Sequence, residues 1–114
     1  MFFPESHTRI WLYTEATDMR KSFQGLAEIT KVKLKEDPTS GHLFAFLNKR
    51  KNYMKVLYFD RTGYCLWCKK LESGSFYFEP CSSRKRQLDL TQFKLLLEGL
   101  VENTFKKRRR FSKK

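Results

Sequence analysis

Cys65 and Cys68 have the C-x-x-C spacing found in zinc sites and in thiol redox motifs, and Cys81 and His42 are further potential zinc ligands. The surrounding stretch, YCLWCKKL, is rich in strand-forming residues, and side chains three positions apart on a strand point to opposite faces. A thioredoxin-like motif would instead place the pair at a helix N-terminus. We therefore expect structural cysteines, no metal site and no cofactor.

Carboxylates are the next candidates, because two-metal phosphoryl transfer needs several of them around ions about 3.5–4 Å apart. The 12 acidic residues are scattered along the chain. Glu36 and Asp37 are neighbours in a predicted turn, and Asp18, near Glu15, is explained as a helix cap. The sequence contains no Ser-His-Asp arrangement and no phosphate-binding loop motif. We predict no catalytic residue, so a metal-dependent nuclease is the weaker alternative.

Clusters of Lys and Arg are the strongest chemical signal. The formal net charge is +12, from 24 Lys and Arg against 12 Asp and Glu, which points to a polyanionic partner such as DNA. Three clusters are expected at a helix start, in a hairpin turn and in a loop, and a fourth forms the C-terminal tail. The candidate nucleic-acid-binding residues are Arg20, Lys21, Lys49, Arg50, Lys51, Arg84, Lys85, Arg86, Lys106, Lys107, Arg108, Arg109 and Arg110.

Arg20 and Lys21 are expected in the first turn of a helix, which is an unfavourable place for cations by about 0.3–1 kcal/mol each. Helix N-termini present backbone N–H groups to phosphate, so the two cations would complete an anion site there. The alternative is that both side chains extend into water. Aromatic residues near the basic turns, such as Tyr53 and Tyr64, could stack on unpaired bases, although most aromatics are needed for the core.

The last ten residues, FKKRRRFSKK, hold seven cations and no acid, so the rest of the chain carries +5 (12 − 7). No apolar run approaches the roughly 20 residues that a membrane span needs, and MFFPESHTR lacks the order of a signal peptide. Three cysteines, an odd number, agree with a reducing compartment. We expect a cytoplasmic protein without a membrane partner.

Apolar periodicity predicts the elements that position these groups. A first strand is expected over about 9–16, and a helix capped by Thr17 or Asp18 over about 18–35. Turn residues fill 36–42. Later elements are strands at 43–48, 53–60, 64–71 and 75–80, a basic connection, and a helix at 91–105 capped by Thr91.

The short polar links between the four consecutive strands are typical of an antiparallel meander. We therefore predict an α+β fold, an antiparallel sheet of four or five strands covered mainly on one face by two helices. Both faces of the strands are largely apolar, so each needs a cover or a partner. A single domain is expected over 1–104, followed by a basic tail at 105–114.

Three stretches resemble a known family: TRIWLYTEATDMRKSFQGLA at 8–27, EDPTSGHLFAFLNKRKNYMKVLYFDRTGYCLWCKKLESGSF at 36–76, and LTQFKLLLEGL at 90–100. The chain resembles the small TnpB or Orf2-type accessory proteins of bacterial insertion sequences of the sixty-six group. The resemblance implies a factor that works beside a separate, larger transposase and has no established catalytic activity. The chain departs from the usual pattern in its long basic tail beyond LLLEGL.

The expected function is a non-catalytic accessory factor for transposition that binds DNA phosphates or assists the transposase. Expected partners are DNA, the element-encoded transposase and a further accessory protein, with the oligomeric state left open. One alternative is a protein-interaction module that docks on the transposase through an apolar sheet face without binding DNA. RNA binding is another.

Overall fold

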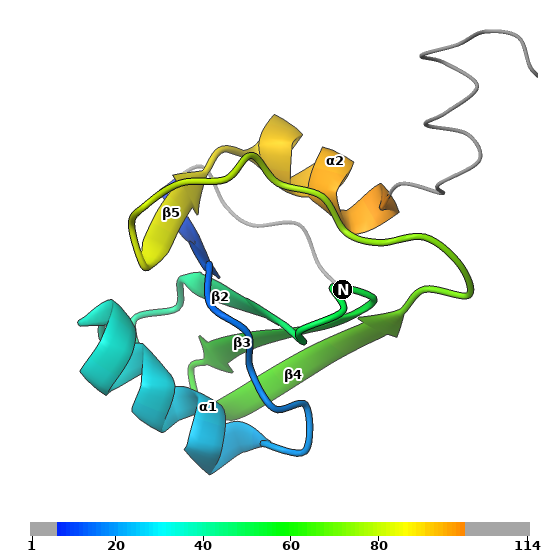
Figure 1. Ribbon diagram of the computed structural model, residues 1–114. Helices are drawn as coiled ribbons and strands as arrows, with labels where there is room; N and C mark the ends of the chain where they lie inside the picture. Colours follow the sequence, from blue (N-terminus) through cyan, green and yellow to red (C-terminus); the bar gives the residue numbers. More distant parts are fainter. Residues whose placement is uncertain (1–6, 100–114) are drawn as a thin grey trace, which may run out of the picture.

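The computed structural model describes residues 7–99 and has three layers, with helical segments on either side of a five-stranded sheet (Figure 1). In chain order the elements are β1 (Ile10–Tyr13), α1 (Phe23–Ile29), η1 (Thr30–Leu34), β2 (Leu43–Leu47), β3 (Tyr53–Asp60), β4 (Gly63–Lys70), β5 (Lys85–Leu88) and α2 (Leu90–Glu98). The α+β class is confirmed. The predicted tail, 105–114, lies outside the described residues.

The sheet is mixed, with strand order β4-β3-β2-β1-β5. β2, β3 and β4 form the predicted antiparallel meander, and β5 pairs antiparallel with β1. β1 and β2 are parallel, so the prediction of a purely antiparallel sheet was wrong. The reason is the helical connection between them, since a strand–helix–strand unit brings the second strand back in the direction of the first.

The fifth strand is not the one expected from the sequence. The stretch 75–80 forms no regular strand, although Phe76 is fully buried and its N–H donates to the Lys51 carbonyl oxygen. The strand is KRQL, β5, within the stretch predicted as a basic connection. Of its four residues only Leu88 is buried, which explains why apolar periodicity did not predict it.

The two helical layers lie on opposite faces of the sheet, so the prediction of two helices mainly on one face was wrong. One face packs against α1 and η1, and its core contains Tyr13, Leu26, Ala27, Leu34, Phe44, Phe46 and Leu57. The other packs against α2, and its core contains Ile10, Leu12, Leu43, Ala45, Leu47, Met54, Val56, Phe76, Leu88, Phe93 and Leu96. A sheet that is apolar on both faces needs both covers.

Both helices begin at residues other than those predicted. α1 begins at Phe23 after Ser22, because the Asp18 side chain accepts the Arg20 backbone N–H at 2.9 Å and holds the chain in a turn. α2 begins one residue before the predicted cap. Its N-cap is Asp89, whose carboxylate accepts the Gln92 N–H at 2.7 Å while the Gln92 side chain accepts the Asp89 N–H at 2.9 Å. Residues 100–105 of the predicted helix lie outside the described part of the chain.

Candidate nucleic-acid interface

Strand directions bring three basic segments to one end of the sheet. β1, β2 and β4 end there, and β3 and β5 begin there. The segments are the turn between β2 and β3, the last residue of β4, and the residue before β5. We call the exposed cations at this end, Lys49, Arg50, Lys51, Lys70 and Arg84, the basic edge.

The β2–β3 turn holds its three cations on a well-bonded backbone. The Asn48 side chain accepts the backbone N–H groups of Asn52 and Tyr53 at 3.0 and 3.1 Å and donates to the Asn52 side chain at 2.7 Å. The Lys51 N–H donates to the Asn48 carbonyl oxygen at 3.0 Å. Lys51 has a φ of 58°, in the left-handed region that glycine favours, and its ammonium lies 5.1 Å from the Phe78 ring centroid.

The chain between β1 and α1 runs along this same end of the sheet. The Thr14 N–H donates to the Arg84 carbonyl oxygen, and the Thr17 N–H donates to the Leu47 carbonyl oxygen, each at 2.8 Å. Further on, the buried Lys55 of β3 donates its ammonium to the Lys21 carbonyl oxygen at 2.8 Å. The Lys21 backbone therefore lies against β3, and Arg20 and Lys21 belong to the turn before α1 and not to its first helical turn.

Arg20 is paired with an acid of its own turn. Its guanidinium donates to both Asp18 carboxylate oxygens, at 2.7–3.1 Å. These hydrogen bonds lower the pKa of Asp18 from 3.8 to about 2 and raise the pKa of Arg20. The Arg20 side chain is still 90% exposed, so it is accessible to a phosphate that competes with Asp18.

Arg84 contacts an acid at 3.3 Å, the distance from its Nε atom to a Glu15 carboxylate oxygen. The other Glu15 oxygen accepts the Tyr13 hydroxyl at 3.2 Å. Burial, followed by the charge of Glu15, raises the pKa of Tyr13 above its usual 10.0, so this hydroxyl stays protonated near neutrality. Within residues 7–99, Lys49, Arg50, Lys51 and Lys70 form no salt bridge, which leaves their charges available to a ligand.

Lys85 and Arg86, the other two cations of this cluster, do not face the same way as each other. They are consecutive strand residues, so their side chains point to opposite faces of the sheet. The Lys85 ammonium lies 2.5 Å from the Glu36 carboxylate and 4.6 Å from the Trp11 ring centroid. The Arg86 guanidinium donates to the Glu79 carbonyl oxygen at 2.8 Å on the α2 side. The cations at 106–110 lie outside the described residues.

Lys55 and Lys70 were missed from the sequence because each was taken as an ordinary strand residue. Their ammonium groups lie 5.8 and 6.0 Å from the ring centroid of Tyr53. A signal was present, however. Lys70 ends the strand that pairs with the start of β3, so a correct strand order places it next to the basic turn.

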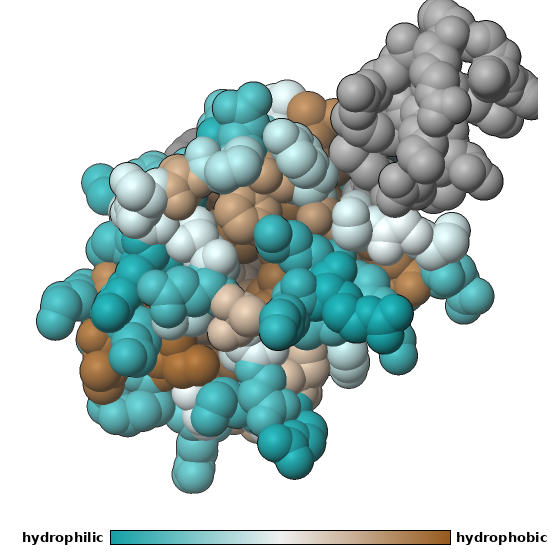
Figure 2. All heavy atoms as spheres, in the orientation of Figure 1, coloured by the Kyte–Doolittle hydropathy of each residue, from teal (hydrophilic) through white to brown (hydrophobic). Residues whose placement is uncertain are grey.

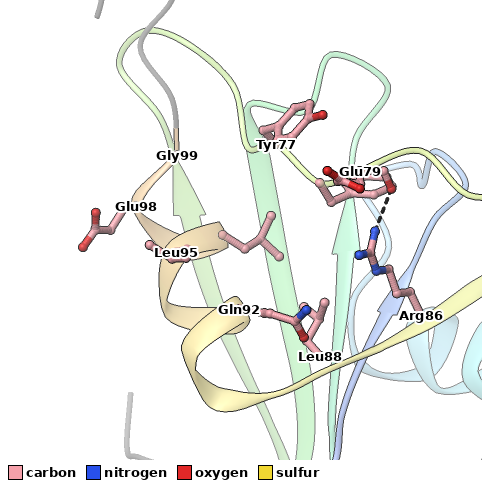
Figure 3. A pocket seen from close by; sticks show the side chains of 10 residues that line it. Tyr77, Glu79, Arg86, Leu88, Gln92, Leu95, Glu98 and Gly99 are labelled. Carbon is pink, nitrogen blue, oxygen red and sulfur yellow. Dashed lines mark hydrogen bonds between the residues drawn. The ribbon is translucent and has the colours of Figure 1, made fainter. Parts of the chain in front are cut away.

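An apolar groove lies on the α2 side of the sheet, and one of its lining residues, Phe78, has the Lys51 ammonium of the basic edge near its ring. It has a volume of about 590 Å³ and runs between α2 and the stretch 77–79. Figure 3 shows Tyr77 and Leu95 on opposite sides of this groove, with Arg86 pointing to Glu79. Tyr77 is 54% exposed and Leu95 is 65% exposed, so the groove presents unusually large apolar side chains to solvent.

The cysteines and acids form no metal site within residues 7–99, where no group of three or more His, Cys, Asp or Glu side chains could hold an ion. Cys65 and Cys68 are opposite Tyr58 and Lys55 of β3, on the two different faces of the sheet. The two cysteines of the C-x-x-C pair therefore cannot bind the same metal ion. Among the same residues, no helix is long and apolar enough to cross a membrane.

Comparison with known proteins shows the family to which the chain belongs. The sequence profile described as "IS66 Orf2 like protein" matches residues 8–107, which include the whole basic edge. The chain belongs to the IS66 Orf2-like family. Two relatives from Sinorhizobium fredii strain NGR234, both described as uncharacterised, are y4jC and y4hO. They are 34% identical over 100 residues, covering 88% of this chain and 86% of y4jC, and 33% identical over 94 residues, covering 82% of each chain.

No solved structure significantly matches this IS66 Orf2-like chain. The family points to an accessory protein associated with insertion sequences, as the sequence resemblance implied. Because the family profile ends at residue 107, it stops within the C-terminal run of cations.

Proposed function

We propose that this IS66 Orf2-like protein is a non-catalytic accessory factor for transposition that binds DNA phosphates through the basic edge. The observation that carries the proposal is the convergence of cations from three separate segments at one end of the sheet. Four of them have no carboxylate partner among the described residues. Solvated charge runs of unrelated loops would have no reason to share one end.

Phosphate contacts position a protein on DNA without reading its sequence, so we expect weak sequence preference. On duplex DNA, the logarithm of the binding constant falls with the logarithm of the salt concentration, with a slope of about −0.9 for each neutralised phosphate. Four unpaired cations therefore supply a slope of roughly −4. The cations at 106–110 remain predicted contributors, and they would make this slope steeper.

The test is a titration of labelled duplex DNA with the full chain at several salt concentrations, read by fluorescence anisotropy. Lys49→Gln/Arg50→Gln removes two cations from the basic edge. Its matched control is Arg9→Gln/Arg61→Gln, which removes two cations from the opposite end of the sheet, where β1 begins and where β3 turns into β4. Removal of residues 105–114 measures how much of the DNA affinity the tail contributes.

We expect the Lys49/Arg50 double variant to lose more affinity than the Arg9/Arg61 variant and to reduce the salt slope by about 1.8. Equal losses in the two variants would mean that only net charge matters. Absence of binding by the unaltered chain at low salt would refute a direct DNA role. Metal-dependent cleavage of the DNA would refute the non-catalytic assignment.

The apolar groove favours a second candidate function, docking on the transposase or another protein of the transposition complex. Exposed Tyr77 and Leu95 are the side chains that such a partner would bury. Leu95→Ser tests this role, because it should weaken association with purified transposase while leaving DNA binding unchanged. A Leu95→Ser protein that still binds transposase normally would exclude the groove.

A further inference from the structure

An open aromatic cleft lies at the start of α1, on the sheet face that α1 covers. It has a volume of about 650 Å³ and is lined by Ser22, Phe23, Gln24, Gly25 and Tyr64. The Phe23 side chain is 42% exposed, although a ring of this size is normally buried. Figure 2 shows apolar atoms at the surface over the far end of the α1–η1 segment, whereas the start of α1 is largely hydrophilic in this view. We call this site the aromatic cleft.

The two rings of the aromatic cleft are held differently. Tyr64 is packed edge-on against Phe59, with ring centroids 5.2 Å apart and an interplanar angle of 81°. This contact fixes one wall of the cleft on β4. Phe23 is the first residue of α1, and its ring forms the other wall, which is more exposed than Tyr64. An exposed flat ring is a platform on which any nucleobase can stack.

Lys21 borders the aromatic cleft. A Cβ atom added at Gly25 would lie 3.2 Å from the Cβ and Cγ atoms of Lys21, so the lysine stem lies against the helix at this glycine. A Cβ at this position would require the Lys21 stem to shift by a few tenths of an ångström, which works against the roughly 1 kcal/mol by which alanine is otherwise favoured over glycine in a helix. The close approach of the lysine stem also places a cation beside the cleft, within a turn whose carbonyl is bound by Lys55.

A row of side chains joins the aromatic cleft to the basic edge. On β4, Tyr64, Leu66, Cys68 and Lys70 alternate onto the same face. Tyr53 lies opposite Lys70, with the ammonium groups of Lys55 and Lys70 near its ring. From Tyr64 to Lys70 the strand rises roughly 20 Å, which matches at most about six stacked nucleotides. Cations and aromatic rings in one row are typical of single-strand binding surfaces.

We propose that the aromatic cleft binds an unpaired base of single-stranded DNA whose phosphates lie on the basic edge and Lys21. This inference rests on the proposed function, and it names the form of DNA that the site takes. Duplex DNA would reach the cations but not the cleft, because its bases are stacked inside the helix. An exposed Gln24 amide next to the stacked base can both donate and accept hydrogen bonds.

The test compares a labelled single strand of about twelve nucleotides with the matching duplex, using the full chain and fluorescence anisotropy at one salt concentration. Phe23→Leu keeps an apolar side chain but removes the ring, and Phe23→Trp enlarges it. The matched control is Val32→Ala, which alters a 50% exposed apolar residue of η1. Thermal unfolding confirms that each variant is folded.

We expect Phe23→Leu to weaken single-strand binding by about fivefold or more, the effect of losing one stacked base, and to change duplex binding by less than about twofold. Phe23→Trp should bind the single strand at least as well as the unaltered protein, and Val32→Ala should bind normally. An unchanged affinity of Phe23→Leu for the single strand would overturn the proposal that the aromatic cleft binds a base.

Three other outcomes are distinguishable. Duplex binding without any binding of the single strand would overturn this inference and leave the proposed function standing. Failure to bind either form would overturn both. Much tighter binding of single-stranded RNA of the same sequence would overturn the assignment to DNA.

Discussion

Replacing Lys51 by glycine or by alanine separates its backbone conformation from its charge. The residue has a φ of 58°, and its backbone is fixed by the bond from its N–H to Asn48 and by the bond from the Phe76 N–H to its carbonyl. A non-glycine residue in this region costs about 1–2 kcal/mol, and glycine gives back about 0.4–1 kcal/mol through the greater freedom of the unfolded chain. Both replacements lose the ammonium over Phe78 equally.

Lys51→Gly should therefore be more stable than Lys51→Ala by about 1 kcal/mol, which corresponds to a melting temperature about 4 °C higher. Urea unfolding followed by tryptophan fluorescence measures the difference. DNA binding should not follow stability, because both variants lose one cation from the basic edge and should reduce the salt slope by about 0.9.

Two results would refute this reasoning separately. Equal stability of the glycine and alanine variants would show that the left-handed conformation at Lys51 carries no strain. An unchanged salt slope in both variants would show that Lys51 does not contact phosphate. If both expectations hold, the turn retains a lysine where glycine would fold better.

Three further predictions concern single carboxylates. Asp18→Asn breaks the ion pair with Arg20 and should raise DNA affinity, with a salt slope steeper by up to about 0.9 in the same anisotropy titration; weaker binding would mean that Asp18 organises the site. The Asp18 pKa should be about 2 in an NMR carboxyl titration and return towards 3.8 in Arg20→Gln, because the guanidinium bonds are its main cause. Because folding lowers the pKa of Asp18, the stability that this carboxylate contributes is present above about pH 4 and is lost as the pH falls through about 2. A pKa near 3.8 in the unaltered protein would contradict the pairing of Asp18 with Arg20. Asp89→Ala removes the capping box of α2 and should cost about 0.5–2 kcal/mol in urea unfolding, whereas Asp89→Asn should cost much less; equal losses would argue against the cap.

The central part of the fold was predictable from the sequence, because β2, β3 and β4 are apolar runs separated by short turns. β5 was not, because an edge strand with one buried residue has no apolar periodicity. The late start of α1 was also missed, because aspartate is a common N-cap residue and Asp18 was expected to cap the helix. In the structure the Asp18 side chain is instead bonded to Arg20. The parallel pairing of β1 with β2 could have been inferred from the helix between them.

The candidate site was predictable only as a set of clusters. The turn at Lys49, Arg50 and Lys51 is where the sequence placed it, and strand order then determines which other cations lie nearby. For Arg84, Lys85 and Arg86, sequence proximity was misleading, because the strand alternation of β5 turns neighbouring side chains to opposite faces. The exposure of Phe23 could not be read from the sequence, since an aromatic residue on an apolar stripe is normally assigned to the core.

The position of β1 between β2 and β5 constrains how the polypeptide can be made. β2, β3 and β4 are consecutive and can pair as soon as they leave the ribosome, whereas β1 is synthesised first and acquires its second neighbour last. Until residue 88 has emerged, one edge of β1 has no partner and remains open to unrelated chains. Premature termination before β5 would therefore give a product prone to aggregation even though most of the apolar core had already been translated.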